Sequence, residues 1–182
     1  MKIGINALSA QAGGGINDLQ NLLPSIIKID KQNNYIIFIT KTQKELIKII
    51  PTEMKKVEIN YLPSNHYLSA PFRHLWEQFI FPFYIMMYRI DVLYSIGNIT
   101  SILAPCRIVL YIGNANPYSL KYVKWPLKYR VQNIELKWLG WLSAKRADKV
   151  RFPSKNTMNL LYKHLNLPLD KCIVIYNGLN DN

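Results

Sequence analysis

The fold is decided near the N-terminus by KIGINALSAQAGGGINDL, residues 2–19. Residues 2–8 form a short apolar run that predicts a β-strand, and the apolar residues of 16–30 recur at helical spacing. Between them lie three adjacent glycines, which are costly to order because glycine loses more backbone freedom on folding than any other residue. We therefore expect a strand, a loop whose backbone comes close to a ligand, and a helix.

This glycine loop has the chemistry of an anion site. Backbone N–H groups without covering side chains can approach a phosphate, and a helix N-terminus adds partial positive charge. We predict that Gly13, Gly14, Gly15 and Ile16 bind a phosphate or sugar ligand, with a plain flexible turn as the alternative. The spacing differs from GxGxxG, no GK[ST] follows, and the next strand ends without a ribose-binding acid. NAD and a Walker A loop are therefore disfavoured.

Strands and helices alternate along the remaining chain. This pattern predicts one α/β domain, a doubly wound and mainly parallel Rossmann-like sheet with helices on both faces. Thr42 and Glu45 predict a capping box at the start of the second helix. Further strands are expected at 34–40, 56–62, 91–95, 107–112, 149–153 and 172–176, and helices at 42–50, 71–89, 122–147 and 154–165.

The composition points to an anionic partner. The 182 residues carry a formal net charge of +12, and 49% of them are hydrophobic, enough for a buried core. Cys106 and Cys172 each begin an apolar run and are expected to be buried free thiols, without a metal-binding cluster. The N-terminus does not have the pattern of a signal peptide, and the apolar run 79–88 is too short to span a bilayer. We expect a cytoplasmic protein, peripheral to the inner face of the membrane if attached to it.

Two later loops carry Gly-Asn directly after a strand, in YSIGNIT (94–100) and YIGNANPY (111–118). The carboxyl ends of parallel strands share one edge of the sheet, where ligands bind in open α/β folds. Asparagine amides suit sugar hydroxyls, so we predict that Asn98 and Asn114 help to bind a sugar. Ordinary turns are the alternative for each loop taken alone.

A polar set interrupts the aromatic segment FRHLWEQFIFPFY (72–84). Glu77 is expected to bind substrate hydroxyls or act as a base. His74 is expected to pack or to face solvent rather than to catalyse.

Residues 121–151 combine basic and aromatic side chains. Such a segment is typical of a surface that meets anionic lipid headgroups. A core-packing helix with a solvated basic face explains it equally well. Nucleic acid is a weaker reading, because no RRM, KH, helix-turn-helix or zinc motif is present. The candidates for membrane contact are Trp125, Lys128, Arg130, Lys137, Trp138 and Trp141.

Five stretches carry a family resemblance. They are KIGINALSAQAGGGI, LWEQFIFP, DVLYSIGNIT, ADKVRFPSKNTMNLL and LPLDKCIVIYNGLN. In their order and separations, the chain resembles the N-terminal domain of GT-B glycosyltransferases of retaining family 4, which build bacterial surface polysaccharides and lipid-linked sugars.

The resemblance implies two Rossmann-like domains facing across a cleft. Residues 1–176 would be the N-terminal, acceptor-binding domain, and 177–182 the start of the hinge to a C-terminal domain that holds a nucleotide-diphosphate sugar. The acceptor would be a glycan or a lipid-linked sugar, with Glu77, Asn98 and Asn114 as its candidate contacts, and no metal or other cofactor is implied. Without the donor-binding domain the chain is expected to be inactive. The alternative is a non-catalytic module that pairs with a separate donor-domain subunit or another protein.

This sequence departs from the family in one loop. Many relatives carry His-Asp where this chain has Gly113-Asn114. Asn114 is therefore the catalytic candidate that the resemblance places in that loop.

Overall fold

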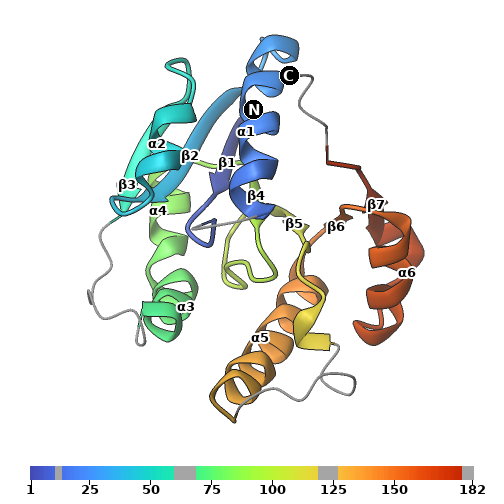
Figure 1. Ribbon diagram of the computed structural model, residues 1–182. Coiled ribbons are helices and arrows are strands. Elements are labelled where there is room, and N and C mark those ends of the chain that lie inside the picture. Colours follow the sequence, from blue (N-terminus) through green and yellow to red (C-terminus); the bar gives the residue numbers. More distant parts are fainter. Residues whose placement is uncertain (11–13, 60–68, 119–126, 178–182) are drawn as a thin grey trace.

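The computed structural model describes residues 1–10, 14–59, 69–118 and 127–177 (Figure 1). Its strands form one seven-stranded sheet in the order β3-β2-β1-β4-β5-β6-β7, with every neighbouring pair parallel. The chain order reverses between β1 and β4, which makes their carboxyl ends the topological switch point. The strands are β1 Lys2–Asn6, β2 Asn34–Thr40, β3 Lys55–Ile59, β4 Val92–Ile96, β5 Arg107–Tyr111, β6 Lys149–Phe152 and β7 Cys172–Val174.

Helices cover both faces of the sheet, which confirms the doubly wound prediction. One buried cluster includes Leu19, Leu23 and Leu46 of α1 and α2, and the other includes helical residues such as Phe81 and Leu161. Central strands are therefore apolar on both sides, as parallel strands between two helical layers must be. The helices are α1 Gly14–Ile29, α2 Lys44–Ile49, α3 Ser69–Phe79, α4 Phe81–Tyr88, α5 Leu127–Arg146 and α6 Lys155–His164, with short 3₁₀ turns at Asn116–Tyr118 and Leu169–Lys171.

The single helix predicted for 71–89 is wrong, because the chain forms α3 and α4 with a break at Ile80. Pro82 lies in the first turn of α4, where its missing N–H costs nothing. In an uninterrupted helix its ring would clash with the carbonyl of Gln78. The α4 helix ends at Arg89, which adopts a left-handed conformation with φ of 53°.

The predicted capping box of the second helix is also wrong. The N-cap of α2 is Gln43, without a side-chain capping bond, and the Thr42 hydroxyl instead pairs with that of Thr40 at 2.8 Å. The Gln43 amide donates to the carbonyls of Ala7 and Ala10, both at 2.7 Å. Its oxygen accepts the Thr40 N–H at 2.7 Å. Gln43 thus holds the chain after β1 against the end of β2, and the helix begins after it.

Both cysteines are free, as expected, but they are only partly buried. Burial raises the pKa of the Cys106 thiol to about 11, which keeps it protonated and unreactive at neutral pH. Each lies beside its strand, before β5 and at the start of β7, and their side chains pack at the margin of the core.

Candidate functional site

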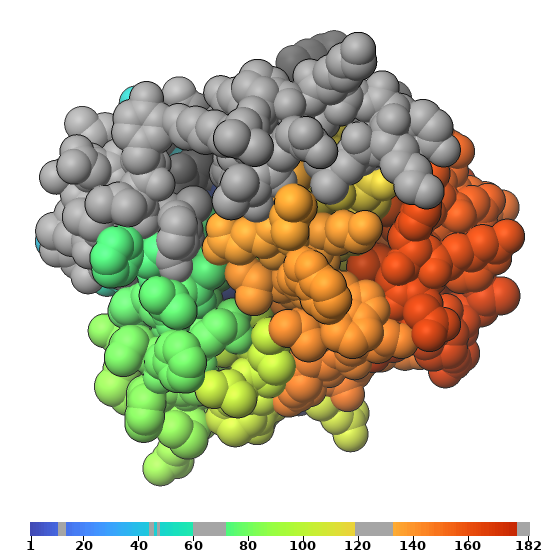
Figure 2. Space-filling model, turned by 90° about the horizontal axis from the view of Figure 1, so that it is seen from below, coloured from blue at the N-terminus to red at the C-terminus, as the bar shows by residue number. Residues whose placement is uncertain are grey.

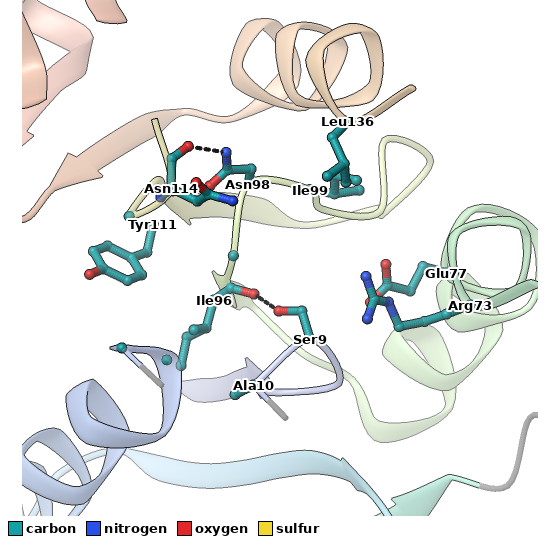
Figure 3. A pocket seen from close by; sticks show the side chains of 14 residues that line it. Ser9, Ala10, Arg73, Glu77, Ile96, Asn98, Ile99, Tyr111, Asn114 and Leu136 are labelled. Carbon is teal, nitrogen blue, oxygen red and sulfur yellow. Dashed lines mark hydrogen bonds between the residues drawn. The ribbon is translucent and has the colours of Figure 1, made fainter. Parts of the chain in front are cut away.

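A cavity of about 390 Å³ opens at the carboxyl edge of the sheet (Figure 3). Its walls come from the chain after β1, the start of α1, the loops after β4 and β5, and single turns of α3 and α5. The three loops that the sequence predicts at one edge of the sheet therefore do meet around one cavity. It lies at the switch point between β1 and β4, where ligands bind in this class of fold.

The glycine loop contributes Gly14 and Gly15 to this cavity. A Cβ built on Gly14 would meet nothing within 4 Å, and one on Gly15 would lie 3.4 Å from the Cβ of Ala10. Ile16 points its side chain into the core, where 6% of it is exposed, so only its backbone could serve a ligand. Gly13 lies outside the described residues. The first turn of α1 thus brings its backbone to the cavity wall at Gly14 and Gly15.

Hydrogen bonds hold the turn after β1 against the end of β4. The side-chain oxygen of Asn6 accepts the N–H of Leu8 at 3.2 Å, which ends β1 earlier than its apolar run predicts. The Ser9 hydroxyl then donates to the carbonyl of Ile96. Gly97 follows with φ of 95°, and a Cβ there would collide with the Ser9 side chain. A glycine is therefore required at position 97.

Asn98 and Asn114 bind each other across the two Gly-Asn loops. The Asn98 amide donates to the carbonyl of Asn114 at 2.6 Å, and its oxygen accepts the Asn114 N–H at 3.2 Å. The side chain of Asn114 is itself exposed and accepts the N–H of Asn116 at 2.9 Å. Asn98 therefore supports the loop that carries Asn114. Ligand contact by either residue, and a catalytic role for Asn114, stay predictions.

Glu77 and Arg73 project from α3 toward the same side of the cavity (Figure 3). Glu77 is 2% exposed, and its oxygen accepts the Asn6 amide over a long 3.4 Å. Burial raises the pKa of Glu77, while the charge of Arg73 and the bond from Asn6 oppose that rise. A carboxyl group in this setting holds a proton more tightly than usual and is a stronger base when ionised.

His74 connects α3 and α5, the two helices that contribute to the walls of the cavity. It is buried, and its Nδ1 lies 2.9 Å from a carboxylate oxygen of Glu135 on α5. Its Nε2 lies 2.9 Å from the Arg73 guanidinium. Burial and the charge of Arg73 lower the pKa of His74 despite the opposing effect of Glu135. Its surroundings are those of a packing residue that ties α3 to α5.

One buried ion pair was not predicted from the sequence. Arg151, on β6, forms two 2.9 Å bonds to the carboxylate of Asp18 on α1, and both side chains are at most 5% exposed. The same guanidinium donates to the Tyr94 hydroxyl at 2.6 Å and to Asn177 at 3.0 Å, and it lies 4.6 Å from the ring of Tyr111. The sequence did hold a signal for this pair, because Asp18 is a lone charge on the apolar face of α1 and Arg151 is one within a buried strand. Charges in such positions need partners.

Most of the basic aromatic segment, residues 121–151, lies in α5. Its side chains differ in exposure. Lys137 is exposed and Trp138 is 63% exposed, but Trp141 packs against the core. Trp141 is itself only partly buried, and its ring centroid lies 6.1 Å from that of Trp138. Membrane contact by these residues stays a prediction. Trp125 and the side chains of Lys128 and Arg130 lie outside what the structure describes.

Two features are absent from the described residues. None of their helices is long and apolar enough to cross a bilayer. They hold no group of three or more His, Cys, Asp or Glu side chains arranged to bind a metal ion.

Comparison with solved structures identifies the architecture. The UDP-GlcNAc 2-epimerase from Neisseria meningitidis bound to UDP-GlcNAc matches 97% of this chain with a TM-score of 0.63 at 14% identity. MurG from Acinetobacter baumannii matches 98% with a TM-score of 0.56 at 14% identity. A glycosyltransferase from Rickettsia africae matches 98% with a TM-score of 0.54 at 17% identity.

The chain has the fold of one Rossmann-like half of a GT-B protein. It spans 47%, 46% and 43% of those three chains, less than half of each. No family model matches the sequence, and no curated protein sequence matches it significantly. At these identities the likeness establishes the fold, while the function must be argued from the site.

Proposed function

We propose that this chain is the acceptor-side half of a nucleotide-sugar-dependent glycosyltransferase. The cavity at the switch point carries the proposal, because the first residues of α1 and a buried carboxyl group line the same space. The N–H groups of Gly14, Gly15 and Ile16 would face the donor diphosphate and stabilise its growing negative charge. The wall formed by α3 would face the acceptor.

Glu77 is the group in this cavity best suited to an acceptor hydroxyl. Ionised, it would accept a hydrogen bond from that hydroxyl and take its proton as the oxygen bonds to the sugar and the sugar–phosphate bond breaks. Arg73 lies close enough to moderate the effect of burial on the Glu77 pKa. Asn114, exposed at the opposite wall, would contact the sugar.

A nucleotide sugar is the substrate class that fits both the site and its structural neighbours. One of those neighbours is bound to UDP-GlcNAc, and another solved UDP-GlcNAc 2-epimerase is in complex with UDP-GlcNAc and UDP. The sequence motifs favour glycosyl transfer over epimerisation, because they resemble those of family 4 transferases.

Photolabelling tests this proposal with the chain itself. An azido derivative of UDP-GlcNAc should label peptides from the chain after β1 and from the loops after β4 and β5, and excess UDP-GlcNAc should suppress that label. Covalent capture detects even weak binding. Labelling confined to the opposite edge, where Lys2, Asn34 and Lys55 line a second cavity, would contradict the proposal.

A further inference from the structure

Arg73 is the one basic side chain among the described residues that line the cavity, and Glu77 is the one acidic side chain. Both belong to α3 and are four residues apart, so they share one face of the helix. Figure 3 shows the guanidinium of Arg73 on the cavity side of α3, beside the carboxyl group of Glu77. The wall that is proposed to face the acceptor therefore carries a cation.

His74 orients this guanidinium without cancelling its charge. Nη2 of Arg73 lies 2.9 Å from Nε2 of His74, and Nε2 must accept because arginine can only donate. Nδ1 of His74 then carries the ring proton and donates to Glu135 of α5 at 2.9 Å. Burial and the charge of Arg73 lower the pKa of His74, which favours this neutral ring. Figure 2 shows α3 (green) and α5 (orange) side by side, so Glu135 fixes the orientation of His74 and, through it, of Arg73.

The positive charge of Arg73 has no carboxylate partner within the part of the chain that the structure describes. It takes part in none of the ion pairs found there, and its Nε is buried without a hydrogen-bond acceptor. The carboxyl group of Glu77 accepts from Asn6 instead. The segments that precede α3 and α5 in the sequence, residues 60–68 and 119–126, contain no aspartate or glutamate. A partly buried cation without a counter-charge costs free energy, and an anionic ligand would offset that cost.

We propose that Arg73 is a specificity-determining residue that binds a carboxylate or phosphate group on the acceptor. This inference rests on the proposed function, which places the acceptor at the α3 wall. A guanidinium matches the oxygens of either group with parallel N–H donors. His74 takes up one N–H of Nη2, and the other terminal N–H groups remain for the ligand.

The spacing of Arg73 and Glu77 narrows the class of acceptor. Four residues of α-helix rise about 6 Å, which is comparable to the width of a sugar ring. A single sugar could therefore present its reacting hydroxyl to Glu77 and its anionic group to Arg73. The acceptor is then an acidic sugar, either a uronic acid or a sugar phosphate.

A titration of the ¹⁵N-labelled 182-residue chain with three sugars tests the proposal. Methyl β-D-glucuronide carries a carboxylate, glucose 6-phosphate carries a phosphate, and methyl β-D-glucoside carries neither. The Nε–H of Arg73 is buried, which protects it from exchange with water, so its resonance is a direct reporter. It should shift saturably with the anionic sugar that matches, and the neutral sugar should bind about tenfold more weakly or worse.

Two variants separate Arg73 from the general positive charge of the chain. Arg73→Gln removes the charge but keeps a polar side chain, and it should reduce the preference for the anionic sugar about tenfold. Arg107→Gln removes the same charge from an exposed position at the amino edge of the sheet and is the matched control. Its preference should stay within about twofold of that of the native chain. The measurement on the native chain does not depend on the folding of either variant.

Four outcomes would overturn the proposal. Neither anionic sugar shifts the Arg73 resonance, or the neutral sugar binds as tightly as both of them. Alternatively, Arg107→Gln loses as much preference as Arg73→Gln, or Arg73→Gln weakens UDP-GlcNAc binding as much as binding of the anionic sugar, which would assign Arg73 to the donor.

Failure of the proposed function gives a different result. The anionic sugars would then bind at Arg73 while UDP-GlcNAc does not bind to the chain. That result would remove the acceptor role and leave an anion site at Arg73.

Discussion

Gly14 and Gly97 are glycines for different reasons. At Gly97 the backbone has φ of 95° and a Cβ would strike Ser9, so the fold itself demands glycine. At Gly14 the backbone is not left-handed, and a Cβ would meet nothing within 4 Å. Neither conformation nor packing among the described residues requires glycine at position 14. The proposed function supplies a reason, because a ligand that approaches the backbone there would be blocked by a side chain.

Alanine substitution should separate the two roles. Gly14→Ala should raise the free energy of unfolding by about 0.5–1 kcal/mol, because alanine favours the helix, and should weaken UDP-GlcNAc binding. Gly97→Ala should lower the free energy of unfolding by about 1–3 kcal/mol through backbone strain. Urea denaturation measures both. A Gly14→Ala chain that is less stable than the native chain would mean that the loop needs this glycine for its own conformation.

Glu77 should make stability depend on pH. Burial raises the folded-state pKa of Glu77 above the ordinary 4.5. The contribution of Glu77 to the free energy of unfolding is therefore fully present below pH 4.5 and is lost as the pH rises through the raised pKa. Glu77→Gln should therefore gain stability relative to the native chain as pH rises from 4.5, by about 1.4 kcal/mol for each unit of pKa shift.

Thermal and urea unfolding from pH 4 to pH 8 measure this difference. Glu53→Gln, at an exposed carboxylate near the opposite edge, is the control and should show no such trend. A Glu77→Gln chain that loses stability at neutral pH would show that Arg73 holds the carboxylate charged in the folded state.

Among the elements, the buried ion pair of Arg151 and Asp18 links β6 to α1, the helix that follows the glycine loop. Arg151→Met or Asp18→Leu alone leaves one buried charge unpaired and should cost about 3–5 kcal/mol. The double variant should cost clearly less than the sum of the two, because it leaves no isolated charge. Urea denaturation of the four chains of this cycle gives the coupling. Strictly additive losses would mean that the pair does not act as a unit.

The sequence predicts most elements because their signals are local. Apolar runs identify the strands, and helical spacing identifies α1, α5 and α6. The errors arise where a distant or neighbouring group overrides the pattern. Pro82 divides the expected helix into α3 and α4. Gln43 reaches back to Ala7 and Ala10, which moves the start of α2 beyond Thr42.

At the scale of the whole molecule, strand order brings the glycine loop and the two Gly-Asn loops to one cavity, as parallel topology requires. The side-chain partners within the site could not be predicted in the same way. Asp18 and Arg151 are 133 residues apart, and His74 and Glu135 are 61 apart. Their pairing depends on how helices pack, which no local pattern encodes.

The proposed function depends above all on the binding of a nucleotide sugar in the carboxyl-edge cavity. A titration of the ¹⁵N-labelled chain with UDP-GlcNAc, followed by amide chemical shifts, tests it most directly, since glycine amides are well resolved and weak binding suffices. We expect saturable shifts at Gly14, Gly15 and Gly97, which line the cavity, and none at Gly4 in β1. The absence of saturable shifts, or shifts confined to Lys2, Asn34 and Lys55 at the opposite edge, would contradict it.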